Sequence, residues 1–398
     1  MISRLRSFQS LWGTQPKPVD TFGRQRFTTS QSAFKGAKEG SLIAGSGLER
    51  GRVAFDATQF NKRVPSTCSA LLPIFLKAAA SAVGMAQQNG GGHGGPPEQS
   101  RSGLLVAQQI LNDKLGNGCE AVYREFDRLR RGRLPGTCLV AQLPGNERRN
   151  RYTNVLPFDE NRVRLRSPGH DYINASSLAS PASEAPAWRY IATQGPKDST
   201  VGDFWQMVYE SNSAVVVMLT RLQESGAMKK CAEYFPQEID QPVTYKGSWT
   251  VTCASARDVD SDVRHRDLIV TPPSPVTGPP RRVYHFQYHA WPDHGVPTTT
   301  QPLRDLLAAV RGLHSPAAGP AVVHCSAGIG RTGTFCAVDI ALQRLRSGDY
   351  GVAVSAAELK PVVAELRRQR VGMVQTAEQY LFCYRAVKDE VDTEVGTS

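Results

Sequence analysis

The chain has 398 residues, and its content of 40% hydrophobic and 21% charged residues is typical of a globular protein with a sizeable core. Its formal net charge is +11, but residues 1–100 carry 12 Lys/Arg and 5 Asp/Glu, whereas the rest carries 35 and 31. This balance excludes a strongly basic body. We therefore expect no nucleic-acid partner, and a phosphate site in the body must depend on local geometry.

Residues 1–100 are predicted to be a low-complexity, disordered basic extension that ends in a Gly/Pro-rich linker. No acidic residue precedes Asp20, which is typical of organelle transit peptides as well as of disordered basic tails, so organellar targeting stays open. The apolar stretch 69–86 is interrupted by Pro73 and Lys77 and barely reaches the length of a spanning helix. We expect no stable membrane insertion.

Eight cysteines are scattered along the chain without a CxxC pair or a metal-ligand spacing with histidines. Scattered cysteines in a chain of this length are typical of reduced thiols in a cytosolic compartment. The pattern therefore predicts a cytoplasmic protein without a disulfide framework, a metal site or a cofactor.

From about residue 104 the pattern becomes that of interleaved helices and strands. Residues 104–132 have helical apolar spacing and end in basic residues followed by Gly132, a typical helix stop. Apolar or alternating runs predict strands further on. The expected strands cover 214–220, 281–291 and 320–324, and the expected helices cover 198–211, 334–348 and a segment that begins at Pro361. This order predicts an α/β or α+β domain over residues 104–392.

The segment VVHCSAGIGRTGTF, residues 322–335, joins the last expected strand to a helix through small residues. Gly328 and Gly330 let successive backbone N–H groups face one point, where the positive end of the helix dipole adds to them. Arg331 supplies a planar guanidinium that matches two phosphate oxygens. Because such donors lower a thiol pKa, we expect Cys325 to be a thiolate that attacks bound phosphate and forms a phospho-cysteine.

Cleavage of a phosphate monoester also needs a proton donor for the departing oxygen. Asp293 lies in HAWPDHGVP, residues 289–297, about thirty residues before Cys325. Gly295 and Pro297 are expected to be hinges of a mobile loop. Closure of this loop is expected to raise the pKa of Asp293 and let it protonate the leaving group.

These segments resemble those of the tyrosine-specific protein tyrosine phosphatases, a cysteine-based family, here of the non-receptor type. VHCSAGIGRTG is similar to their phosphate-binding signature and WPD to their general-acid loop. Weaker similarities follow in the family's order at 148–165, 171–176, 191–196, 203–208, 230–236 and 375–382. The resemblance implies a single domain with a twisted mixed sheet flanked by helices, preceded by a disordered tail. It also implies a metal-independent enzyme of signal transduction that hydrolyses phosphotyrosine in proteins.

Carried over residue by residue, the resemblance implies that Cys325 is the nucleophile and that Arg331 binds the phosphoryl group. Asp293 would be the general acid and base, and Gln375 would position the hydrolytic water. Tyr152 would stack on the substrate ring and set the depth of the pocket. Phosphotyrosine would then reach the thiolate, and the shorter phosphoserine would not.

The resemblance implies supporting roles as well. Glu224 would pair with the phosphate-binding arginine, Thr332 would hydrogen-bond the sulfur, and His324 would orient the loop rather than transfer a proton. Trp291 would belong to the general-acid loop. The further substrate-binding positions would be Asn154, Ser326, Ala327, Gly328, Ile329, Gly330 and Gln379.

Two positions depart from the family pattern. Asn154 stands where relatives usually have an aspartate that accepts hydrogen bonds from the substrate backbone, so peptide affinity is expected to be weaker. His294 stands where many relatives have a phenylalanine that packs over the substrate. Because histidine titrates near ~6.5, closure of the general-acid loop is expected to depend on pH.

Two other functions fit part of the pattern. A broader phosphatase that acts on phosphoserine/threonine, phosphoinositides or RNA 5′ ends would share H-C-x5-R, but such relatives usually lack the NRY segment found here at 150–152. A phosphopeptide-binding module without activity would typically have lost the Cys, Arg or Asp, and all three are present. The sequence leaves the physiological substrate and the oligomeric state open.

Overall fold

The computed structural model describes residues 98–132, 136–166, 169–181, 187–224, 228–274, 278–292, 295–315 and 318–396. All of them belong to one compact unit. The predicted N-terminal extension, the possible targeting segment and the apolar stretch 69–86 lie outside the described residues, as do Asp293 and His294. Within the described part, no helix combines the length and the apolar content needed to cross a membrane.

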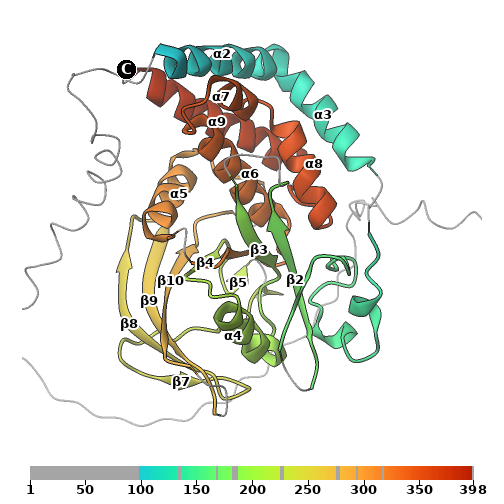
Figure 1. The fold of residues 1–398 in the computed structure, drawn as a ribbon, viewed down its shortest axis with the longest axis vertical. Coiled ribbons are helices and arrows are strands. Elements are labelled where there is room, and N and C mark those ends of the chain that lie inside the picture. The colour runs from blue at the N-terminus through green and yellow to red at the C-terminus, as the bar shows by residue number, and fades with distance from the viewer. Residues whose placement is uncertain are drawn as a thin grey trace, which may run out of the picture. The chain divides into compact units, whose positions relative to one another are not determined.

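A mixed sheet of nine strands forms the centre of the described part (Figure 1). Its order is β1-β2-β3-β11-β4-β10-β9-β8-β7. Four inner strands run parallel to one another: β3 (Arg189–Thr193), β11 (Ala321–His324), β4 (Val215–Met218) and β10 (Arg281–Tyr288). The outer strands pair antiparallel and comprise β1 (Arg162–Arg164), β2 (Tyr172–Ala179), β7 (Val243–Thr244), β8 (Thr250–Asp258) and β9 (Val263–Thr271).

Helices cover both faces of this sheet because its inner strands are apolar on both sides. In β4, Val216 and Met218 join the cluster around α4 (Val201–Glu210), whereas Val215 and Val217 join the cluster on the opposite face. This alternation is the two-residue period of a strand. The opposite face is covered by α5 (Gln301–Leu313) and α6 (Gly330–Leu345), with α2 (Glu98–Leu115), α3 (Glu120–Arg130), α7 (Tyr350–Ala356), α8 (Leu359–Gln369) and α9 (Ala377–Gly396) around α6 (Figure 1).

The expected strands at 214–220, 281–291 and 320–324 are confirmed as β4, β10 and β11, and the helix expected at 334–348 is α6 with an earlier start. The helix expected at 198–211 consists of the 3-10 turn Asp198–Thr200 followed by α4.

Two expectations about helices were wrong in detail. The continuous helix expected at 104–132 is α2 and α3, separated by the 3-10 turn Asn117–Cys119, whose three residues have positive φ. The helix expected from Pro361 is α8, which begins at Leu359. A proline within the first turn is tolerated because its missing N–H has no partner inside the helix.

The seven described cysteines are all free, and five of them are buried: Cys231, Cys253, Cys325, Cys336 and Cys383. No disulfide joins any two of the described cysteines, and reduced thiols remain the prediction for this part of the chain. Cys68 lies outside the described residues.

The core between α6 and the sheet yields a stability prediction. Leu342 on α6 is 1% exposed and belongs to the larger core cluster. Leu342→Ala should lower the free energy of unfolding by about 2–5 kcal/mol, since it removes buried methyl groups and leaves a cavity. Leu139→Ala, at a side chain 65% exposed, is the control and should change it by no more than about 0.5 kcal/mol. Urea denaturation checks both variants, and equal effects would contradict the packing described here.

Candidate active site

The loop of residues 325–331 connects the central strand β11 to the N-terminus of α6. The N–H of Gly195 donates to the Ser326 carbonyl at 2.9 Å, which ties the loop to the end of β3. Gly328 has φ of 73°, and a Cβ there would lie 2.0 Å from the Thr193 carbonyl oxygen. Only glycine fits this position, because the left-handed conformation and the close backbone both exclude a side chain.

Arg370 holds the outer side of this loop. Its guanidinium is fully buried and donates to the carbonyl oxygens of Gly328 at 2.9 Å and Ala327 at 3.1 Å. It also donates to Asn174 Oδ1 at 2.8 Å and Ser176 Oγ at 3.1 Å, both in β2. Burial lowers the pKa of Arg370 to about 10, so the side chain still carries its charge at neutral pH. With the loop carbonyls held outward, the loop N–H groups are free to face inward as an anion nest.

Sequence reasoning missed Arg370. It lies in the run RRQR at residues 367–370 and has no local pattern that separates it from its neighbours. Its four acceptors come from β2 and from the 325–331 loop, far away along the chain. Only the folded arrangement identifies it.

Cys325 lies inside the loop with its side chain 5% exposed. The N–H of Gly328 donates to its Sγ at 3.3 Å. Burial acts to raise the pKa of this thiol, but Thr332, through its hydroxyl and its N–H, and the charge of Arg331 outweigh burial and hold the pKa below its ordinary value. The Thr332 hydroxyl is buried and has no other hydrogen-bond partner among the described residues, so its proton is available to the sulfur. The site therefore favours a thiolate.

Arg331 is clamped at the mouth of the loop. Its Nη1 donates to Glu224 Oε1 at 2.5 Å and to the Leu219 carbonyl at 3.1 Å. Glu224, whose side chain is 4% exposed, also accepts from Thr220 Oγ1 at 2.7 Å. Nη2 donates to the carbonyl of Pro292 at 3.0 Å. Pro292 immediately precedes Asp293 in the chain. The described end of the WPD segment therefore contacts Arg331, the residue expected to bind phosphate.

His324 belongs to a buried chain of hydrogen bonds behind the loop. Its Nδ1 lies 3.1 Å from the Cys325 carbonyl, and its Nε2 lies 2.7 Å from the Tyr234 hydroxyl. Because a carbonyl only accepts, Nδ1 carries the proton and Nε2 accepts from Tyr234. The tyrosine oxygen then accepts from His285 Nε2 at 2.8 Å. Burial lowers the pKa of His324 to about 4, so a neutral ring orients the loop rather than supplying a proton at neutral pH.

Tyr152 and its neighbours approach the loop from the other side. The Tyr152 hydroxyl lies 2.8 Å from Ser326 Oγ. The preceding Arg151 donates to the carbonyls of Gly195 at 2.9 Å and Pro196 at 2.6 Å, which fixes the direction of the segment. Asn154 is exposed two residues further on and forms no hydrogen bond with any described residue.

The two glutamines lie together at the start of α6. A Cβ on Gly330 would meet Gln379 Nε2 at 3.0 Å and Gln375 Oε1 at 3.1 Å. Gln379 is buried and accepts from the Gln375 N–H at 2.9 Å. Trp291 is also buried, and its ring packs against Phe382 of α9. The structure thus brings these residues together around the 325–331 loop, whereas for Asn154 it shows only an exposed side chain.

No group of three or more His, Cys, Asp and Glu side chains in the described residues is placed to hold a metal ion.

Comparisons with known proteins agree with this geometry. A family model described as protein-tyrosine phosphatase matches residues 146–389. "Protein-tyrosine-phosphatase PTP1" of Arabidopsis thaliana is 40% identical over 303 residues, which cover 73% of this chain and 86% of the plant protein. "Tyrosine-protein phosphatase non-receptor type 9" of Homo sapiens is 37% identical over 307 residues, 73% of this chain and 49% of the human protein. "Phosphatidylinositol phosphatase PTPRQ" of Rattus norvegicus is 38% identical over 260 residues, but this match spans only 11% of the rat protein.

The environment of Cys325 predicts how its pKa responds to mutation. Thr332→Val removes one hydrogen-bond donor to the sulfur, so the thiol pKa should rise and the pH midpoint for iodoacetamide alkylation of Cys325 should move upward. Thr334→Val is the matched control on the same helix, because the Thr334 hydroxyl donates to the Gly330 carbonyl instead. An unchanged midpoint in Thr332→Val, or the same shift in both variants, would contradict this account.

Proposed function

The chain belongs to the protein-tyrosine phosphatase family, and from this premise we propose that it hydrolyses phosphotyrosine in proteins through a phospho-cysteine on Cys325. The observation that carries the proposal is the buried sulfur that accepts the Gly328 N–H next to a clamped Arg331. We place the catalytic domain at residues 104–392. The reaction belongs in a reducing compartment such as the cytoplasm, where the thiolate persists.

The substrate binds with its phosphoryl group in the 325–331 loop, held by the N–H groups of Ser326, Ala327, Gly328, Ile329 and Gly330 and by Arg331. The ring of phosphotyrosine stacks on Tyr152. Because Cys325 is 5% exposed, a long side chain is needed to bring phosphorus to its sulfur. Asn154, exposed two residues after Tyr152, contacts the substrate backbone in this proposal through its neutral amide, so it binds peptide more weakly than a carboxylate would.

In the first step, the thiolate attacks phosphorus, the Sγ–P bond forms and the bond from phosphorus to the phenolic oxygen breaks. Asp293 donates its proton to that oxygen, and neutral tyrosine leaves. The guanidinium of Arg331 stabilises the negative charge on the transferring oxygens. Its pairing with Glu224 means that the fork is already oriented before substrate arrives.

In the second step, water attacks the phospho-cysteine. Gln375, with Gln379 beside it, orients the water, and Asp293 accepts the proton. The Sγ–P bond breaks, inorganic phosphate leaves and the thiolate returns. The donors of Thr332 stabilise the departing sulfur anion, which is why the group that lowers the thiol pKa also aids this step.

Selectivity among phosphate esters tests the substrate class. With matched peptides, kcat/KM for phosphotyrosine should exceed that for phosphoserine by at least about a hundredfold, since only the former reaches the buried thiolate. Tyr152→Ala should lower kcat/KM for the phosphotyrosine peptide and so reduce the ratio of the two kcat/KM values. A phosphoinositide is the third substrate to compare, given the printed name of the rat relative. Higher kcat/KM for the phosphoinositide or the phosphoserine peptide would refute the proposed substrate.

Replacement of the proton donor tests the mechanism. Asp293→Asn should lower kcat for the phosphotyrosine peptide by about 10²–10⁴ and abolish the fall in rate at alkaline pH, since an amide has no acidic proton to lose. Asp305→Asn, at an exposed position on α5, is the control and should leave kcat unchanged. If Asp293→Asn retains wild-type kcat, Asp293 is not the general acid.

A further inference from the structure

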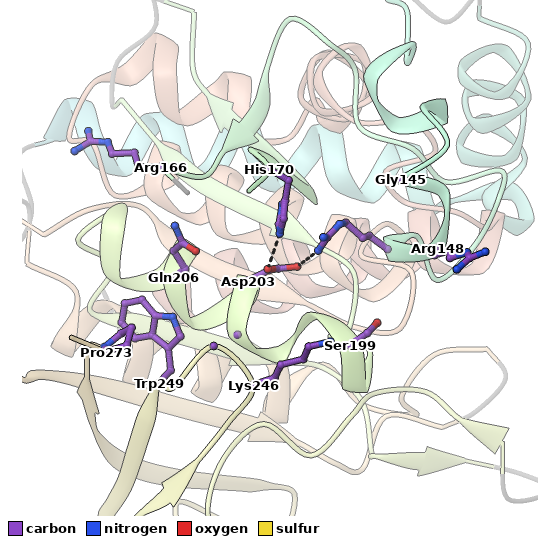
Figure 2. Close-up of a pocket in the computed structure, with 13 residues that line it drawn as sticks. Gly145, Arg148, Arg166, His170, Ser199, Asp203, Gln206, Lys246, Trp249 and Pro273 are labelled. Atoms are coloured by element: carbon purple, nitrogen blue, oxygen red, sulfur yellow. Dashed lines mark hydrogen bonds and ion pairs between the residues drawn. The ribbon is translucent and has the colours of Figure 1, made fainter. Parts of the chain in front are cut away.

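A second cavity lies apart from the 325–331 loop, with a volume of 530 Å³ (Figure 2). Its walls come from the segment before Tyr152, the end of β1, the start of α4 and the turn between β7 and β8. The lining residues are Gly145, Arg148, Arg149, Arg166, His170, Ser199, Gly202, Asp203, Gln206, Lys246, Gly247, Trp249 and Pro273. None of them is a residue of the proposed active site, and the volume is that of a small-molecule pocket.

The charged residues that line this cavity are mostly positive. Four of its lining residues are Arg or Lys, and one, Asp203, is acidic. The carboxylate of Asp203 already has partners among the lining residues, because Arg149 Nη1 lies 2.7 Å from its Oδ2 and His170 Nε2 lies 3.3 Å from its Oδ1. Figure 2 shows Asp203 and His170 in the middle of the residues drawn. The formal excess of three positive charges therefore faces whatever occupies the space.

Three of the cations are exposed and form no side-chain ion pair in the described part of the chain: Arg148, Arg166 and Lys246. The charge of Lys246 acts on Asp203 from a longer distance, and the backbone N–H of Arg166 donates to Glu210 Oε2 at 2.9 Å. They come from three separate segments, and Figure 2 shows Arg166 and Arg148 toward opposite ends with Lys246 on the wall between them. Unpaired cations that face one cavity repel one another, so an anion there is stabilised by all three. The first turn of α4, which contains Gly202 and Asp203, adds the positive end of a helix dipole to the same wall.

The spacing and the charge together identify the ligand chemistry. A carboxylate carries one negative charge, whereas a phosphoryl group carries about 1.5 to 2 near neutral pH and matches a guanidinium fork. Two phosphoryl groups supply about the charge that the cavity lacks, and they can contact cations at separate ends. We propose that this cavity binds a ligand that carries at least two phosphoryl groups, on a free small molecule or on a phosphorylated polypeptide.

The cavity is also connected to the substrate-binding segment. Lys197 Nζ, at the end of the loop before α4, donates to the carbonyls of Arg148 and, at 3.0 Å, of Asn150. These residues directly precede Arg151, which donates to the Gly195 carbonyl, and Tyr152, whose hydroxyl lies 2.8 Å from Ser326 Oγ in the 325–331 loop. A ligand held by Arg148 therefore contacts the same short segment that carries the expected ring-stacking residue.

The test uses the full chain with its active site first filled by orthovanadate, and it titrates inorganic tripolyphosphate by calorimetry. Wild type should bind the probe. Arg148→Gln/Arg166→Gln/Lys246→Gln should weaken binding by at least about tenfold, because charge-assisted hydrogen bonds are the strong ones. The control Arg128→Gln/Lys360→Gln/Arg385→Gln removes the same charge from exposed sites elsewhere and should bind like wild type. Thermal unfolding verifies that both variants are folded, and Arg166→Gln alone should give a smaller loss in the same direction.

No binding to wild type, equal losses in both triple variants, or equally tight binding of a tetraglutamate peptide would overturn the proposal. Displacement of tripolyphosphate by a peptide with two phosphoserines assigns the site to a phosphorylated polypeptide, and failure to displace it assigns the site to a free small molecule. Both results support the phosphoryl chemistry. None of these measurements depends on turnover, so they stand apart from the test of the phosphatase activity.

Discussion

The structure depends on keeping a sulfur anion inside the protein, where burial alone favours the neutral thiol. Cys325 is 5% exposed, and yet its pKa lies below the ordinary value, because hydrogen-bond donors and a cation surround the sulfur. The same donors are arranged to accept a phosphate dianion above it. The 325–331 loop therefore stabilises the nucleophile and binds the substrate with the same donors.

The fold positions that loop by distributing its contacts over distant parts of the chain. β11 is the central parallel strand, so its carboxyl end opens between β3 and β4, and the loop leaves the sheet there. Arg370, at the end of α8, fixes the carbonyls of Ala327 and Gly328 on the outer side of the loop, while His324, itself bonded to Tyr234, holds the Cys325 carbonyl. Glu224 orients Arg331 at the mouth. Each of these groups is buried and charged or polar, so each is costly to leave unpaired.

The sequence alone predicted features whose residues are contiguous, but it did not predict contacts between distant parts of the chain. The strand–loop–helix at 322–335 could be predicted because a nest of small residues, a cysteine and an arginine are contiguous. Strand β4 could also be predicted, because its β-branched residues form a continuous run. Arg370 and the pair Tyr234–His285 could not, since their partners lie far away in the chain and only the fold selects them. The break between α2 and α3 was missed because apolar spacing continues across it, although Gly116 and Gly118 are a turn signal.

The central claim is that the sulfur of Cys325 receives the phosphoryl group. Rapid acid quench of the enzyme with a ³²P-labelled phosphotyrosine peptide, followed by mass spectrometry of the digested protein, tests it most directly. The account predicts label on the peptide that contains Cys325, formed before inorganic phosphate appears, and none in Cys325→Ser, which should be inactive. Label on another residue, or full turnover by Cys325→Ser, would contradict it.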